Sequence, residues 1–157
     1  MTSESFHFLK ERMSHKISAK TEYACIALME LAANQESPEL VRVHQIGTRH
    51  GVPARFLVQI LLQLKSAGIV ESTRGASGGY RLKRRPEEIV LGEVMEILEP
   101  MPVHKRTTHE KTPAMVLKEV WEAAEVHRQN YLHSVTLADL VKMAKLEPTS
   151  TKSAAAR

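Results

Sequence analysis

Apolar side chains recur at helical spacing along the first part of the chain. From Ser18, a residue suited to capping a helix, an apolar stripe predicts a helix that ends near Asn34. A short helix over residues 43–50 is predicted to end at Gly51, because glycine readily adopts the left-handed conformation that often follows a helix. The chain therefore begins as a mostly helical fold.

A third and stronger helical pattern lies between Pro53, which fits a first helical turn, and Gly68. Apolar residues at positions i, i+3, i+4 and i+7 form one stripe: Leu57, Ile60, Leu61 and Leu64. At about 100° per residue, the opposite face carries Arg55, Gln59, Leu62 and Ser66, flanked by Phe56, Val58 and Gln63. The pattern predicts an amphipathic helix with one face buried and the other open.

The period changes from helix to strand after Gly68. The strand-like segments IVESTR and YRLK flank the glycine-rich segment GASGG, which predicts a β-hairpin. A short helix over residues 91–98 follows and is stopped by Pro100. Helix, turn, helix and hairpin in this order are typical of a winged helix-turn-helix, so the predicted fold class is mainly α with a small β-hairpin.

The last third of the chain predicts a long helix outside this unit, over residues 114–133, and a capped helix that ends near Lys145. The long helix has an apolar stripe that one small domain cannot cover, which favours packing on a second copy through Leu117, Val120, Trp121, Ala124 and Tyr131. The predicted organisation is a flexible extension (1–16), a winged helix-turn-helix DNA-binding domain (17–100), a linker (101–113), dimerisation helices (114–146) and a disordered tail (147–157).

Positive charge is concentrated in one segment of the sequence. Residues 49–85 hold eight Lys or Arg against one acid, Glu71, a local net charge of +7, whereas the whole chain has a net charge of +4. A basic segment in an otherwise acidic chain indicates a polyanionic partner, since neutralising phosphates releases counterions. The alternative is a solvated basic face with no partner.

Other functional classes find little support in the sequence. No stretch approaches the roughly 20 apolar residues of a membrane span, and the N-terminus lacks a signal-peptide core, so we expect a cytoplasmic protein. The single cysteine, Cys25, excludes an intrachain disulfide and is more typical of a packed residue than of a redox switch. No nucleophile–base pair or metal triad is evident, so an enzyme is not expected.

The open face of the third helix suits the DNA major groove, which admits one α-helix. We expect Arg55 to pair with guanine, Gln59 with adenine, and Phe56 to offer an apolar edge to a thymine methyl group. The alternative is the solvated face of an ordinary amphipathic helix.

The hairpin suits a wing, because glycines let the backbone approach the sugar-phosphate chain and arginines supply charge. The predicted wing contacts are Arg74, Gly75, Ser77, Gly78, Gly79 and Arg81. A plain turn is one alternative. A nucleotide-phosphate loop is another, but it requires the glycines to open a helix, whereas these lie between two strands.

Two segments of the chain resemble the winged-helix regulators of the Rrf2 family: KISAKTEYACIALMELA and the stretch from His50 to Leu98, with its motifs RGxxGGY and LGEVxExLE. The resemblance is dense over residues 16–100 and weaker around YLHSVTLADLV. It implies a bacterial homodimer that regulates transcription from an imperfect palindrome, with the third helix in the major groove and the wing in the minor groove. By position, it also implies base contacts from Arg55, Phe56 and Gln59 and a phosphate contact from Lys20.

The chain departs from the cluster-binding members of this family, which carry three cysteines before the long helix. No cysteine lies between Met101 and Trp121, so we expect no iron–sulfur cluster and no cofactor. His104 and His109 lie in this segment and would be the candidates for a metal shared across a dimer. Histidines in a polar linker are more often solvated, and no recognised ligand spacing is present, so no metal site is predicted.

The function that these features favour is a sequence-specific DNA-binding transcription regulator, in the repressor mode, with double-stranded DNA, a second copy and a regulatory protein as partners. The alternative is a winged-helix adaptor that binds another protein and does not discriminate between DNA sequences.

Overall fold

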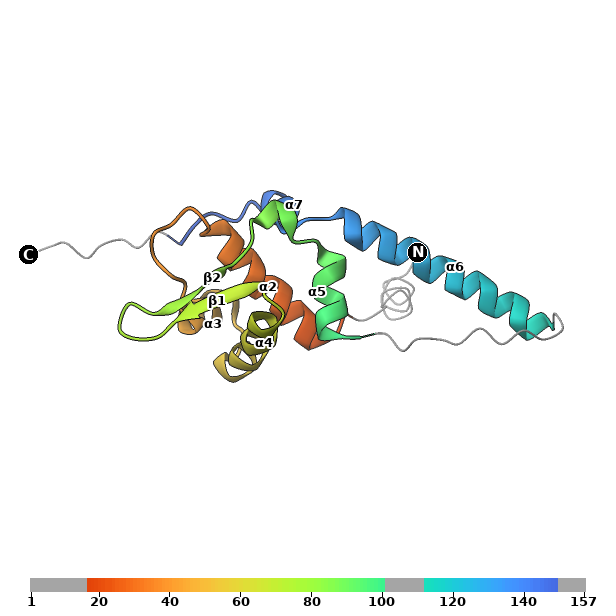
Figure 1. The fold of residues 1–157 in the computed structure, drawn as a ribbon, viewed down its shortest axis with the longest axis horizontal. Helices are drawn as coiled ribbons and strands as arrows, with labels where there is room; N and C mark the ends of the chain where they lie inside the picture. The colour runs from red at the N-terminus through yellow and green to blue at the C-terminus, as the bar shows by residue number, and fades with distance from the viewer. Residues whose placement is uncertain (1–16, 101–111, 150–157) are drawn as a thin grey trace, which may run out of the picture.

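The computed structural model describes residues 17–100 and 112–149. In chain order its elements are α2 (Ala19–Ala33), α3 (Val43–His50), α4 (Ala54–Ser66), β1 (Val70–Thr73), β2 (Gly79–Leu82), the 3-10 helix η1 (Pro86–Glu88), α5 (Leu91–Leu98), α6 (Pro113–Ser134) and α7 (Leu137–Ala144). Figure 1 shows a packed head, made of residues 17–100 together with α7, from which α6 projects as an arm.

Capping residues set the ends of the helices close to where the sequence predicted them. Ser18 Oγ accepts a hydrogen bond from the amide of Thr21 at 3.2 Å and begins α2. Gly51 ends α3 in the left-handed conformation, with φ of 68°. Pro53 is the N-cap of α4 and not, as predicted, a residue of its first turn. Either position needs no amide donor, so the helix starts one residue later without cost.

The core of the head is built on α2 and α4. The predicted inner stripe of α4 is buried, and Leu57, Leu61 and Leu64 have no exposed surface. The other buried apolar residues come from most elements of the head: Ala24, Ala27, Leu28, Leu31, Ala32, Val41, Ile46, Val52, Ile60, Ile69, Val70, Leu82, Ile89, Val94, Leu98 and Leu137. Burying the inner stripe of α4 leaves its other face open to solvent.

Helix α7 packs within this chain, although the sequence grouped it with α6 in a dimerisation unit. Its Leu137 is fully buried in the core. Two backbone hydrogen bonds join this region to the head, from Leu137 N to Ile89 O at 2.9 Å and from Leu91 N to Val135 O at 2.8 Å. The arm is therefore α6 alone.

The hairpin is antiparallel, with Val70 opposite Leu82 and Thr73 opposite Gly79. We call the two strands and the loop 74–78 between them the wing. A third segment extends the sheet by one bridge, since the amide of Tyr80 donates to Val41 O at 2.8 Å and the amide of Val41 donates to Tyr80 O at 3.0 Å. The wing is thus joined to the residues just before α3.

The predicted disordered tail begins at residue 147, but the structure holds residues 147–149 against the head. Arg49 Nη2 donates to Glu147 O at 3.1 Å, and the amide of Thr149 donates to Asn34 Oδ1 at 2.9 Å. The prediction is wrong for these three residues, because their polar composition gave no sign of partners about a hundred positions away. Residues 150–157 lie outside the described residues. Within those described, no helix combines the length and the apolar character needed to cross a membrane.

Candidate nucleic-acid interface

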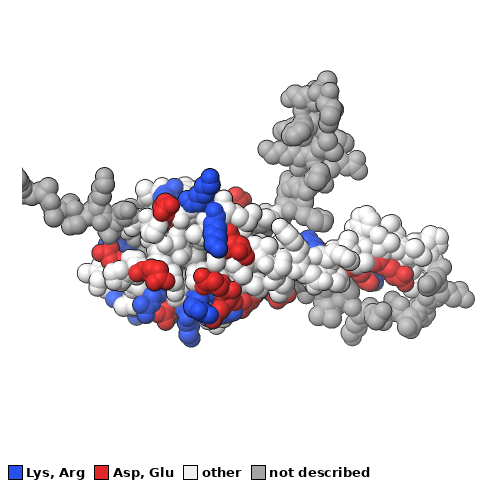
Figure 2. Space-filling model, turned by 90° about the horizontal axis from the view of Figure 1, so that it is seen from above, with Lys and Arg blue, Asp and Glu red and all other residues white. Residues whose placement is uncertain are grey.

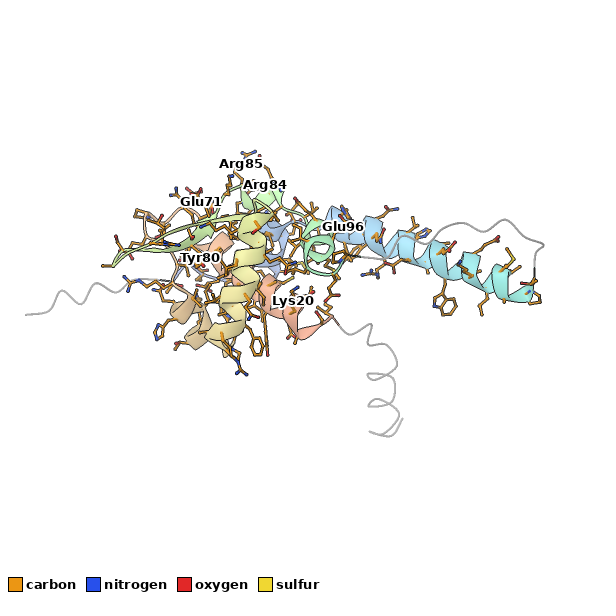
Figure 3. The ribbon with its side chains drawn as sticks, turned by 60° about the horizontal axis from the view of Figure 1, so that its bottom comes forward. Lys20, Glu71, Tyr80, Arg84, Arg85 and Glu96 are labelled. Carbon is orange, nitrogen blue, oxygen red and sulfur yellow. The ribbon has the colours of Figure 1, made fainter. Side chains whose placement is uncertain are left out.

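The outer face of α4 is the centre of the candidate interface. Arg55, Phe56 and Gln59 are all exposed, as the helical pattern predicted, and Val58 and Leu62 beside them are 41% and 52% exposed. In Figure 3 α4 lies at the front of the head with no element covering it. The face is therefore free to enter a groove of matching width.

Arg55 and Phe56 support each other at the start of α4. The guanidinium carbon of Arg55 lies 4.8 Å from the centre of the Phe56 ring, which is the geometry of a cation–π contact. Phe56 also meets the ring of Tyr23 from α2, with the ring centres 6.3 Å apart and the ring planes at 38° to each other. The aromatic pair gives an exposed arginine a defined position before any partner binds.

The wing places the predicted loop residues at one edge of the head. Arg74, Gly75 and Ser77 are exposed, and Gly78 is half-buried. Gly75 has a φ of 109°, a conformation that side chains with a Cβ rarely adopt. Gly78 donates its amide to Gly75 O at 3.0 Å, which closes the turn. The loop is compact enough for its backbone to approach a second molecule closely.

Half of the Lys and Arg side chains in the predicted basic segment form ion pairs in the folded structure. Four of its eight cations pair with carboxylates: Arg49 with Glu30 at 2.8 Å, Arg81 with Glu71 at 2.5 Å, Arg84 with Glu93 at 2.6 Å and Arg85 with Glu88 at 3.1 Å. Figure 2 shows Lys and Arg side chains next to Asp and Glu side chains on one face of the head. The local net charge counted along the sequence therefore overstates the charge offered to a polyanion, because most of the pairing acids lie outside the segment.

The Lys and Arg side chains of the basic segment that have no carboxylate partner lie on α4 and at the hairpin. Within the described residues, Arg55 of α4 and Arg74 of the wing have no carboxylate partner, and neither has Lys83. Lys65 also lacks one and donates to Ser72 Oγ at 2.7 Å. Positive charge is thus retained on α4 and at the base and tip of the hairpin.

Lys20, the residue expected to contact phosphate, is exposed at the start of α2 and donates to Leu98 O at 3.2 Å. Figure 3 shows it on another side of the head from Arg84 and Arg85, which lie together by η1. Lys20 is therefore set apart from the paired arginines.

Sequence reasoning missed Arg42, which precedes the basic segment that we counted. Its guanidinium donates a hydrogen bond to the carbonyl of Ala76 in the wing loop. The available signal was a cation between two apolar residues in VRV, immediately before a predicted helix.

A buried carboxylate fixes the corner between α2 and α3. Glu30 is 1% exposed, and its oxygens lie 2.8 Å from Arg49 Nη1 and 2.8 Å from His50 Nε2. Asn34 and Thr149 also donate to it. Burial raises the pKa of Glu30, but the hydrogen bonds from Thr149, His50 and Arg49 outweigh burial and hold the pKa below its ordinary value. The charged network ties α2 to the end of α3 and to Thr149.

The arm exposes the predicted apolar stripe. Trp121 is 68% exposed and Tyr131 is 67% exposed, and Figure 1 shows most of α6 away from the head. The stripe residues Leu117, Val120 and Ala124 are exposed as well. Only the last part of α6 packs on α5, where His133 Nε2 lies 3.4 Å from Glu96 Oε1. An apolar face this open on a long helix is typical of an interaction surface.

An exposed amphipathic helix beside a glycine-tipped hairpin, both carried on a helical core, defines a winged helix-turn-helix protein. The model of the Rrf2 family, described as an iron-dependent transcriptional regulator, matches residues 17–143. The chain belongs to the Rrf2 family.

Named relatives agree with this assignment over most of the chain. The HTH-type transcriptional regulator IscR of Cereibacter sphaeroides is 33% identical over 135 residues, which cover 81% of this chain and 87% of the relative. Among solved structures, IscR of T. potens has a TM-score of 0.71 at 34% identity, over 85% of this chain and 90% of the other. CymR of B. subtilis, the global cysteine regulator, has a TM-score of 0.70 at 30% identity, over 82% and 97%. The protein is thus a transcription regulator and not an enzyme.

The residues of this chain do not fit an iron–sulfur cluster held by three cysteines. Its one cysteine, Cys25, lies in α2 and packs against the core. Burial raises the pKa of the Cys25 thiol to about 11, which disfavours the thiolate that a metal requires. No group of three potential ligands lies together in the described part of the chain. The histidines named from the sequence, His104 and His109, lie outside the described residues.

Proposed function

We propose that the protein is a sequence-specific DNA-binding regulator that acts as a homodimer on a palindromic operator and needs no bound cofactor to read DNA. The observation that carries this proposal is the open face of α4, where Arg55 stacks on Phe56 and Gln59 lies one turn further along. Arginine and glutamine are the side chains that pair in a bidentate manner with guanine and adenine. The wing beside this face supplies Arg74 for the backbone or the minor groove.

The exposed apolar stripe of α6 supports the proposed dimer. Two heads joined through α6 would present two copies of α4, and a symmetric protein reads a symmetric site. We expect half-sites separated by about one helical turn of DNA, roughly 10 base pairs, or by a multiple of it.

Repression is the mode of action that this architecture favours. A dimer bound across a promoter occupies the same DNA that RNA polymerase must contact, and it can block transcription without further contacts. Transcription of a reporter behind the selected operator, with purified polymerase and rising amounts of the protein, should therefore fall as the operator fills. A rise in the amount of transcript would instead show that the protein activates transcription.

The test of sequence readout begins with DNA selected by the full-length protein from fragmented genomic DNA. In fluorescence anisotropy, Arg55→Ala with Gln59→Ala should reduce the preference for the selected duplex over a scrambled one, at roughly 1–3 kcal/mol for each lost base contact. Arg85→Ala removes the same charge from a residue paired with Glu88 and serves as the control. An unchanged preference in the double variant would exclude base readout by α4.

A second function is favoured by one feature of the same face. Val58 and Leu62 expose apolar surface next to Arg55 and Gln59, which also suits contact with a protein. In that case the chain is a winged-helix adaptor, selection would enrich no DNA sequence, and Leu62→Asp would abolish capture of the protein partner. Enrichment of a palindrome decides against it.

A further inference from the structure

Arg42 lies where the backbone is fixed on both sides. Val41, just before it, forms the bridge to Tyr80 of β2. Arg42 itself caps α3, since its amide donates to Gln45 Oε1 at 2.7 Å and its carbonyl accepts from the amide of Gln45 at 2.9 Å. The backbone at Arg42 is therefore held both by the helix-turn-helix unit and by the sheet.

The far end of the Arg42 side chain reaches the wing loop. Its Nη2 donates to the carbonyl of Ala76, 34 positions along the chain. Within the described residues, this is the one hydrogen bond from a side chain to the loop 74–78; the other bond that orders the loop joins Gly78 N to Gly75 O. Without Arg42 the loop would depend on one internal bond and on two glycines that are costly to order.

Arg42 forms no ion pair with a carboxylate of the described residues. Arg42 is exposed, and the described residues place no carboxylate within ion-pair distance of it. A guanidinium that donates to a carbonyl forms a charge-assisted hydrogen bond and keeps its positive charge beside the wing tip. The bond thus orders the loop without making it less attractive to a polyanion.

We propose that Arg42 is a positioning residue that holds the wing loop, through Ala76 O, at a fixed place relative to α4 before DNA binds. This inference rests on the proposed DNA-reading function. Because α3, α4 and the wing then form one rigid unit, α4 and Arg74 can engage their two grooves together, and the loop need not be ordered on binding. Arg42 would act through Arg74 and the loop backbone and would not itself contact the DNA.

The first experiment uses the full-length protein without DNA. In Arg42→Ala, hydrogen exchange of the Gly78 amide should quicken about tenfold, because its bond to Gly75 O opens more often once the loop is released. The free energy of unfolding should stay within about 0.5 kcal/mol of the wild type, as expected for an exposed side chain. Arg85→Ala, which also removes an exposed arginine, is the control and should leave Gly78 exchange unchanged.

The second experiment measures binding of the protein to the selected operator. Arg42→Ala should weaken binding about tenfold, and most of that loss should vanish in an Arg74→Ala background, since the loop then has no cation left to position. The slope of log affinity against log salt should not change in Arg42→Ala. A direct phosphate contact would instead lower that slope by about 0.9 and give losses that add to those of Arg74→Ala.

The outcomes separate the two levels of the proposal. Unchanged Gly78 exchange, or additive losses with a lower salt slope, would overturn the positioning role of Arg42 while leaving DNA readout intact. A wild-type protein that enriches no DNA would overturn the proposed function, and the positioning role for DNA would fall with it. Faster Gly78 exchange together with non-additive loss would establish the inference.

Discussion

Glu30 is a carboxylate that the fold buries and then surrounds with donors from three parts of the chain. Asn34 lies one turn along α2, Arg49 and His50 end α3, and Thr149 follows α7. A buried charge is costly unless it is paired, so each donor offsets part of the desolvation of Glu30. The carboxylate thereby joins α2 to the last turn of α3, the helix that precedes α4 in the chain.

Glu30→Gln should destabilise the protein by about 2 kcal/mol at pH 7, because charged hydrogen bonds are replaced by neutral ones and Arg49 loses its counter-ion. The pKa of Glu30 is lower in the folded state than its ordinary value of 4.5. At a pH between these two pKa values the unfolded chain binds more protons than the folded protein, so the stability that Glu30 contributes is present above pH 4.5 and is lost as the pH falls through the folded-state pKa. Urea unfolding at pH 7 and at acidic pH should therefore show the gap between wild type and variant closing in acid. Glu36→Gln, at an exposed site, is the control; a gap that is constant with pH would contradict the assignment.

At the scale of elements, the wing depends on the absence of side-chain volume at its turn. A Cβ added to Gly78 would lie 2.9 Å from Gly75 O and 2.9 Å from the carbonyl carbon of Arg74, both backbone atoms that cannot move aside independently. The constraint is one of space, since Gly78 does not have a positive φ, whereas Gly75 does. The motif RGASGGY therefore encodes a loop shape and not only flexibility.

Gly78→Ala should accordingly displace the loop and weaken operator binding about tenfold, a loss of roughly 1.4 kcal/mol in binding free energy. The free energy of unfolding should fall by no more than about 1–2 kcal/mol, because the loop lies outside the core. Fluorescence anisotropy and thermal unfolding would measure the two effects. Ser77→Ala, one position earlier and exposed, removes a hydroxyl without adding a Cβ, so it should leave the free energy of unfolding unchanged and weaken binding less than Gly78→Ala. Equal losses of binding in both variants would point to loss of the loop's polar surface and not to a changed loop shape.

Local pattern was enough to predict the main elements and the pairing of the two strands, but not the side-chain contacts between elements that are distant in sequence. The stripe from Leu57 to Leu64 fixed the orientation of α4, because burial of one face of a helix determines which residues the other exposes. The bond from Arg42 to Ala76 and the ion pair between Arg84 and Glu93 join residues from different elements, and no periodicity encodes them. The residues 147–149 illustrate the same limit, since their partners lie in α2 and α3.

For the whole molecule, the distribution of charge and of apolar surface separates two tasks. The head neutralises Arg49, Arg84 and Arg85 internally and leaves Arg55 and Arg74 unpaired at the reading elements. The arm pairs Lys118 with Glu122 and Arg128 with Glu125, and it exposes its apolar stripe. A molecule divided in this way is suited to bind DNA with one part and a second copy with the other.

The arm makes the assembly testable, because burying a large apolar side chain contributes about 1.5–3 kcal/mol and the stripe holds several. Leu117→Glu with Trp121→Glu should convert a dimer to a monomer in sedimentation equilibrium, since two charges on this face must be desolvated to dimerise. Val126→Glu places one such charge on the opposite side of α6, where the exposed fraction of the side chain is 53%, and should leave the dimer intact. The monomer should keep its helical circular dichroism yet bind the operator roughly 10²–10⁴-fold more weakly, because each head then binds its half-site alone. A double variant that still sediments as a dimer would place the interface elsewhere than on this stripe.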